Sequence, residues 1–80
     1  MKIYYSRTSL KYLQKLEQSI SQKIVESIDK LPDEGDIAKL KGTKIKNLFR
    51  LRIGKHRMLF IIEKENIKVV KIDKRGDVYK

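Results

Sequence analysis

The stretch RLRIGKHR, at residues 50–57, places five basic side chains and a glycine in eight positions. Guanidinium groups stay charged at any working pH and donate paired hydrogen bonds to phosphate oxygens. Arginines held on a rigid framework would therefore form a clamp for phosphate. If Arg52 lies opposite Arg57 on paired strands, their repulsion lowers the stability of the free protein. A sequence that keeps such a pair is typical of a protein that binds an anion.

The residues around this cluster have the pattern of antiparallel strands. A Gly-Lys dipeptide separates two alternating runs, 48–53 and 56–63, and predicts a two-residue hairpin. Side chains alternate between the faces of a strand, so this turn places three arginines on one face. They are Arg50, Arg52 and Arg57. The opposite face would be apolar and would carry Phe49, Leu51, Ile53, Met58, Phe60 and Ile62.

A third run, at residues 67–73, completes the predicted meander after a three-residue turn at 64–66. This turn keeps the alternation in step and places Val70 and Ile72 on the apolar face. The arginine face would then also carry Leu59, Ile61, Val69, Lys71, Asp73 and Arg75. A four-residue turn would reverse the faces of this strand, so its orientation depends on the turn.

The first half of the chain predicts a short strand followed by two helices. Residues 2–6 alternate weakly, and apolar side chains then recur at three- and four-residue spacing from Leu10 to Leu31. Thr8 can cap the first helix, and a capping box beginning at Ser19 divides the stretch in two. Pro32 ends the second helix, because proline lacks the amide and pushes its predecessor out of the helical region. The polar residues 33–47 are expected to form a loop with a short irregular turn.

These elements predict a single α+β domain over residues 1–80. It comprises a short N-terminal strand, an antiparallel helical hairpin, and an antiparallel three-stranded meander that completes a four-stranded sheet. The apolar stripe of the helices and the apolar face of the sheet would pack together, because each must bury its apolar side against another element. The arginine face would remain open.

Charge and composition restrict the possible functions. Residues 1–40 carry seven Lys and Arg against six Asp and Glu, whereas residues 41–80 carry thirteen against four. So lopsided a field attracts polyanions or an acidic partner. The chain lacks cysteine and has one histidine and scattered acids, so we expect no metal site and no cofactor. The longest apolar run is MLFII, and we expect a cytoplasmic protein without a membrane span.

Several stretches together resemble the RelE/ParE superfamily of toxin–antitoxin toxins, especially RelE-like mRNA endonucleases. They are the KLKG turn, the segment FRLRIGKHRMLFIIE and the closing KIDKRGDVYK. LRIGKHR is similar to the family's R-x-G-x-x-R form, and RGDVY to its R-x-x-x-Y ending. By position, Arg57, Arg75 and Tyr79 match the family's site residues. Arg50 and Arg52 fall where some members carry two catalytic lysines.

The resemblance implies a metal-independent endoribonuclease that cleaves mRNA in the ribosomal A site. The ribose 2′-hydroxyl would attack the adjacent phosphate and thereby inhibit translation. The implied catalytic residues are Arg52, Arg57, Arg75 and Tyr79. The implied RNA-binding residues are Lys44, Lys46, Arg50, Lys71 and Lys74. The implied partners are mRNA, the ribosome and a cognate RelB-like antitoxin.

The sequence supplies charge stabilisation better than proton transfer. Arginine does not release its proton at neutral pH, and Asp73 is the only acid predicted on the arginine face. His56 has a suitable pKa, but alternation points it away from that face. Tyr79, ionised by nearby arginines, is a second candidate base, and it could instead stack on an unpaired base. Positioning and charge neutralisation alone could also suffice if the ribosome holds the RNA.

Two other functions stay open from the sequence. A ParE-like toxin of the same superfamily would bind DNA gyrase and would not cleave RNA. A non-catalytic domain that binds RNA or the ribosome would need only the phosphate clamp. The arginines at 57 and 75, together with the tyrosine at 79, favour the nuclease.

Overall fold

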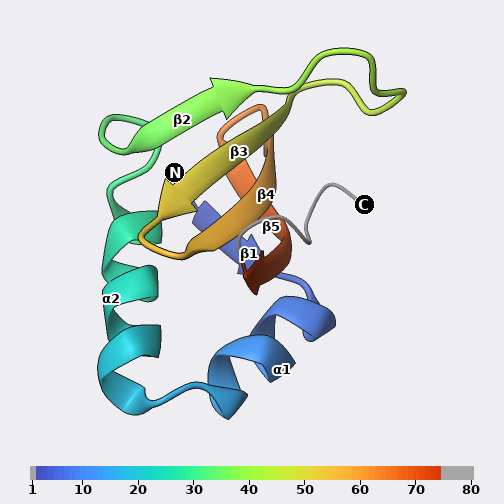
Figure 1. Cartoon of the computed structure of the whole chain (residues 1–80). Coiled ribbons are helices and arrows are strands. Elements are labelled where there is room, and N and C mark those ends of the chain that lie inside the picture. The colour runs from blue at the N-terminus through green and yellow to red at the C-terminus, as the bar shows by residue number, and fades with distance from the viewer. Residues whose placement is uncertain (1, 75–80) are drawn as a thin grey trace.

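The structure, a computed structural model, describes residues 2–74 as one mixed sheet with two helices on one side (Figure 1). The elements are β1 (Lys2–Tyr5), α1 (Arg7–Lys15), α2 (Gln18–Asp29), β2 (Asp36–Lys39), β3 (Leu48–Ile53), β4 (His56–Glu63) and β5 (Asn66–Lys74). The sheet has five strands in the order β1-β5-β4-β3-β2. β1 runs parallel to β5, and the other neighbours are antiparallel. The predicted α+β fold is confirmed, with one strand more than expected.

The extra strand, β2, lies within residues 33–47, which the sequence predicts to be a loop. The loop is therefore shorter than predicted. Ile37 pairs with Leu51 of β3 and packs against the core, while residues 40–47 form the loop that projects beyond the sheet (Figure 1). An edge strand needs only one partner and a single inward apolar side chain, so four residues suffice. Gly35 precedes it at φ +133°, where a Cβ would lie 2.8 Å from Leu51 Cδ1. Only glycine fits this close approach without strain.

The two helices divide where the sequence predicts, but their first residues differ. Ser6, not Thr8, caps α1, because its Oγ accepts a hydrogen bond from the amide of Ser9 at 3.1 Å. α2 follows Glu17 without a side-chain cap, and the expected capping box at Ser19 lies inside the helix. The helices form an open V against the sheet, so the prediction of an antiparallel helical hairpin was wrong (Figure 1). No helix in residues 2–74 is long and apolar enough to cross a membrane.

The hairpin between β3 and β4 has the predicted register. Ile53 pairs with His56 and Arg52 with Arg57 across a two-residue turn, in which Gly54 has φ +58°. Such a turn requires a positive φ at its first central residue. The three arginines of this hairpin therefore lie on the same face, as predicted.

The hairpin between β4 and β5 differs from the prediction in two ways that cancel. Its turn has two residues instead of three, so Val69 faces the core. The prediction that Val69 lies on the arginine face was therefore wrong. A bulge at Val70 then restores the expected alternation, and Ile72 is buried beside Met58. Val70 itself is exposed and is not part of the apolar face.

The bulge is held by the start of α1. The amide of Ser6 donates to the carbonyl of Val69 at 3.0 Å, and its hydroxyl donates to the carbonyl of Val70 at 2.7 Å. The hydroxyl of the fully buried Ser9 lies 2.7 Å from Ser6 Oγ. A bulge leaves backbone groups without a ladder partner, and a serine here satisfies one of them.

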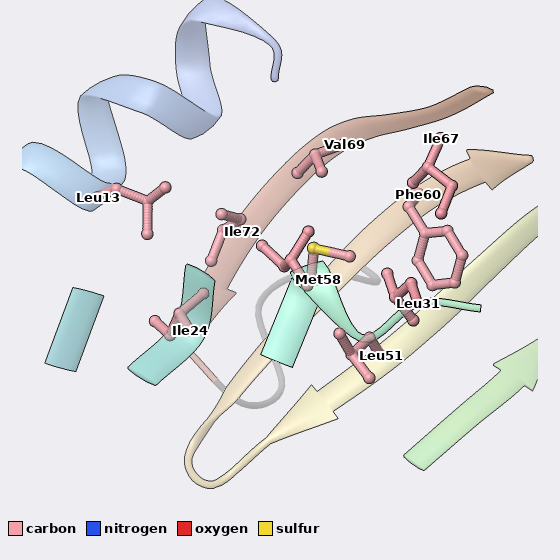
Figure 2. Close-up of a cluster of buried hydrophobic side chains, with 10 residues drawn as sticks. Leu13, Ile24, Leu31, Leu51, Met58, Phe60, Ile67, Val69 and Ile72 are labelled. Carbon is pink, nitrogen blue, oxygen red and sulfur yellow. The ribbon is translucent and has the colours of Figure 1, made fainter. Parts of the chain in front are cut away.

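The core lies between the helices and the apolar face of the sheet (Figure 2). Its buried members are Leu13, Ile24, Ile28, Leu31, Leu51, Met58, Phe60, Ile67, Val69 and Ile72. Phe49 stacks on Phe60 with ring centroids 5.5 Å apart. Every strand contributes at least one buried or packed apolar side chain here, and Ile37 does so for β2. Side chains alternate along a strand, so the opposite face of the sheet receives the intervening ones.

Candidate functional site

We call the face of the sheet opposite the helices the outer face. By register it carries Lys2 and Tyr4 of β1, Asp36 and Ala38 of β2, Leu48, Arg50 and Arg52 of β3, Arg57, Leu59, Ile61 and Glu63 of β4, and Asn66, Lys68, Lys71 and Asp73 of β5. Most of these side chains are charged. The helices do not cover this face (Figure 1).

Four charged residues form one row across the outer face. Asp36 pairs with Arg52, Arg52 with Arg57, and Arg57 with Asp73, on four neighbouring strands. We call these four residues the charged row. Two like charges in the middle are flanked by an acid on each side, so the repulsion expected between the arginines is offset within the sheet.

Asp36 draws a further arginine toward the charged row. One oxygen of its carboxylate lies 3.6 Å from Arg50 Nη2, and the other lies 3.8 Å from Arg52 Nε. Arg50 also donates to the backbone carbonyl of Asp36 at 3.5 Å. Arg50 pairs in register with Ala38, whose small side chain leaves room for the guanidinium to reach across β2. Three guanidinium groups thus share one end of the sheet.

The three arginines differ in exposure. The Arg50 side chain is 14% exposed and that of Arg52 is 45% exposed. Arg57 is half-buried, and its Nε atom is buried. Partial burial strengthens the field that a guanidinium exerts on a bound anion, because less water screens it. The arrangement of the arginines is therefore one that could bind an anion.

On the β5 side of the charged row, Asp73 also contacts its own strand. Its Oδ2 lies 3.9 Å from Lys71 Nζ, and its Oδ1 accepts from the amide of Lys74 at 2.7 Å. Farther along the face, Lys68 pairs with Glu63 at 2.9 Å, and this hydrogen-bonded ammonium lowers the pKa of Glu63. Basic groups outside the charged row thus have acidic neighbours as well.

The other residues that the sequence predicts for RNA binding are dispersed. Lys71 lies on the outer face. Lys74 pairs with His56 and so lies on the helix side of the sheet. Lys44 and Lys46 are exposed in the loop at the opposite end of β3 from Arg52. Arg75 and Tyr79 lie outside the described residues.

His56 points away from the outer face, as predicted. Its ring lies 5.9 Å from that of Tyr12 in an edge-to-face contact. Burial lowers the pKa of His56, the nearby Lys74 ammonium lowers it further, and Asp73 acts in the opposite direction. A histidine on this side of the sheet cannot transfer a proton to or from an anion bound at the charged row.

The whole chain matches a known protein family. The family model described as the ParE toxin of type II toxin–antitoxin systems, parDE, matches residues 3–79. The chain belongs to this family. It is thus a toxin of the RelE/ParE superfamily. A search of curated proteins finds no match.

Solved structures of toxins share the fold. The toxin is similar to a chain of the archaeal RelE–RelB complex from Pyrococcus horikoshii, with a TM-score of 0.77, 25% identity, and coverage of 95% of this chain and 96% of that one. It is also similar to isolated Escherichia coli RelE, with a TM-score of 0.73, 17% identity, and coverage of 98% and 89%. The Staphylococcus aureus YoeB dimer gives a TM-score of 0.71, 21% identity, and coverage of 94% and 97%.

Sequence reasoning missed one residue of this toxin's charged row, Asp36. The residue was assigned to a loop, so its distance from the arginines could not be inferred. A weak signal is present, because Ile37 and Ala38 form a short apolar stretch between Asp36 and Lys39, as in a short edge strand. Asp36 shows that acids as well as arginines occupy the face.

Proposed function

We propose that this toxin is an endoribonuclease that cleaves mRNA on the ribosome. The observation that supports the proposal most directly is the charged row, in which Arg52 and Arg57 are adjacent and Arg50 is turned toward them by Asp36. Guanidinium forks match the oxygens of a phosphodiester in position and charge. The open outer face leaves room for a single strand of RNA.

The proposed reaction is attack of a ribose 2′-oxygen on the adjacent phosphorus. The 2′-hydroxyl loses its proton, the bond to the 5′-oxygen breaks, and that oxygen gains a proton. Arg52 and Arg57 would stabilise the charge that develops on the phosphorus oxygens, which is the term that preorganised donors supply best. Arg50 and Lys71 would hold neighbouring phosphates.

Residues outside the described part of the chain complete the proposal. Arg75 would add a further guanidinium, and Tyr79 would transfer a proton or stack on a base.

Lys44, Lys46 and Lys74 would contact RNA away from the scissile phosphate, since they lie apart from the charged row. Such contacts add affinity that depends on salt without positioning the reacting atoms.

The test is to add the protein to translating ribosomes and to map the ends of the mRNA. Cleavage within the codon in the A site is expected from the wild type and is strongly reduced in Arg57→Ala. Lys11→Ala removes an exposed positive charge from α1, on the helix side, and is expected to leave cleavage unchanged. Intact mRNA with the wild-type protein would exclude the nuclease.

The second candidate function is inhibition of DNA gyrase without RNA cleavage. The observation that favours it is the family model, which is that of a ParE toxin. DNA breaks that depend on gyrase and appear with the wild-type protein, together with intact mRNA on ribosomes, would select this function.

A cognate antitoxin is the proposed partner under either function. The P. horikoshii RelE is in complex with RelB, and a YoeB from S. aureus is in complex with YefM. We expect the antitoxin to present acidic and apolar side chains, because the second half of this chain is strongly basic. Its affinity should fall as salt rises. An affinity independent of salt would assign the binding to apolar contacts.

A further inference from the structure

The outer face carries an exposed aromatic ring far from the charged row. Tyr4 of β1 is 50% exposed, and its register partner on β5 is Lys68. Lys68 pairs in turn with Ile61, which pairs with Leu48. Tyr4 therefore stands on the same surface as the arginines, with mixed apolar and basic side chains between them. Its neighbour Tyr5 points the other way and packs against the core.

Tyr4 borders a hollow at the edge of the sheet. The hollow has a volume of about 750 Å³ and is lined by Lys2, Tyr4, Lys64, Glu65 and Asn66. Two of these residues are lysines, one offers an aromatic ring, and one offers an amide with both a donor and an acceptor. Glu65 adds one negative charge, so the lining stays net positive. These are the groups that hold a nucleotide: a ring for its base, ammonium groups for its phosphate, and an amide for the polar edge of the base.

We propose that Tyr4 stacks on an unpaired base of the RNA whose backbone lies on the charged row. This inference rests on the proposed function, because it assigns a second contact to the same RNA. Lys2 and Lys64 hold the phosphate next to the stacked base, and Asn66 faces the edge of the base. The site takes single-stranded RNA, since a base in a duplex cannot offer its face to a side chain.

The distance between the charged row and Tyr4 fits one short strand of RNA. Four residues of β4, from Arg57 to Ile61, span about 13 Å, and two strand spacings across the sheet add about 10 Å sideways. The diagonal of about 16 Å along the outer face is crossed by basic and apolar side chains, Lys71 and Ile61 among them. A strand that leaves the charged row thus passes over a continuous surface before it reaches Tyr4.

Charge distinguishes Tyr4 from Leu10, another large exposed side chain. Leu10 of α1 is similarly exposed, at 46%, but the hollow beside it is lined by residues such as Gln14, Gln18 and Glu26 and by no lysine or arginine. Stacking on RNA requires a ring beside positive charge, and the Tyr4 hollow on the outer face combines a tyrosine ring with two lysines. Leu10 therefore provides a control of matched exposure.

The experiment is a double-mutant cycle between Tyr4 and the RNA. Ribosome complexes receive mRNA that is intact or that lacks one base at a chosen position near the cleaved bond. Tyr4→Ala should lower kcat/KM on intact mRNA by about 5- to 150-fold, the loss of one stacked base. Removal of the correct base should cost the wild type a similar factor and cost Tyr4→Ala nothing more. Tyr4→Phe keeps the ring and should cleave like the wild type, as should Leu10→Ala.

The possible results distinguish a failure of the stacking site from a failure of the proposed nuclease function. If the wild type cleaves and Tyr4→Ala cleaves equally well, the stacking site is wrong and the nuclease stands. If the wild type does not cleave, the proposed function fails, and binding of a short single-stranded RNA, measured by fluorescence anisotropy, then tests Tyr4 directly. Equal affinity of the wild type and Tyr4→Ala for this RNA overturns the stacking site. If Tyr4→Ala binds the antitoxin more weakly than the wild type but binds RNA equally well, the hollow is a site for a peptide. This result would also overturn the stacking site.

Discussion

The two faces of the sheet are made by the same strands but carry different kinds of side chain. The inner face gathers buried apolar side chains beneath the helices, whereas the outer face gathers guanidinium and carboxylate groups that remain in contact with water. Alternation along each strand separates the two sets, so a change on one face need not disturb the other. Stability and anion binding should therefore respond to different substitutions in this small domain.

The largest effect is expected on the inner face, from Phe60→Ala. Phe60 is fully buried and stacks against Phe49, so its removal leaves a cavity and lowers the free energy of unfolding by about 3–5 kcal/mol. Urea denaturation followed by circular dichroism measures the change. Leu59→Ala, one residue away on the outer face, should cost less, because Leu59 is only half-buried. Equal losses would mean that both faces contribute to the core.

On the outer face, Arg57→Ala should affect activity and spare the fold. Loss of a donor aimed at the developing charge is expected to reduce the cleavage rate about 10²- to 10³-fold. The free energy of unfolding should stay within about 0.5 kcal/mol of the wild type, since this surface is not part of the core. Parallel measurements of mRNA cleavage and urea denaturation check both. A large loss of stability would contradict the separation of the faces.

A smaller effect is expected for Asp36→Asn. The carboxylate offsets the repulsion between Arg52 and Arg57, so its neutralisation should lower the free energy of unfolding by at most about 1 kcal/mol. The loss should shrink at high salt, because salt screens exposed charges. Glu34→Gln removes the same charge from the neighbouring turn and makes none of these ion pairs. A loss that is equal in both variants, or unchanged by salt, would mean that the pairing with arginine has no role in stability.

The smallest effect concerns pH and the helix side of the sheet. The pKa of His56 is lowered in the folded protein by burial and by Lys74, so the unfolded chain takes up this proton first as pH falls. Stability is therefore present above the unfolded pKa of about 6.5 and is lost as pH falls from there toward the lowered folded pKa. His56→Gln should flatten this part of the profile, measured by urea denaturation at a series of pH values. An unchanged slope would assign the dependence to other groups.

Local patterns predicted the parts of the fold that depend on neighbouring residues. The hairpin at Gly54 was predicted in full, because a two-residue turn fixes the register of both strands. The orientation of β5 was harder, since Ile67, Val69, Val70 and Ile72 allow either face to be apolar. The bulge at Val70 depends on a hydrogen bond from Ser6, and such a contact between distant residues leaves no periodic signal.

The candidate site was predicted on β3, β4 and β5 but not on β2. Arg50, Arg52 and Arg57 were placed together from the sequence, because their spacing and one turn determine their face. Asp36 was not, since its proximity depends on an edge strand of four residues that has little pattern of its own. The role of Tyr4 depends on a parallel pairing between the first and last strands, which spacing along the chain cannot reveal.

The position of β5 between β1 and β4 has a consequence for the newly made chain. Tyr5 and Val69 are partners although more than sixty residues separate them, and the contact between Ser6 and Val70 spans 64 positions. Contacts between such distant segments form late and slow folding. During translation, the helices and the first hairpin emerge before their sheet can close. The sheet can thus close only after residues 66–74 have left the exit tunnel, and the charged row, whose Asp73 lies on β5, is completed last.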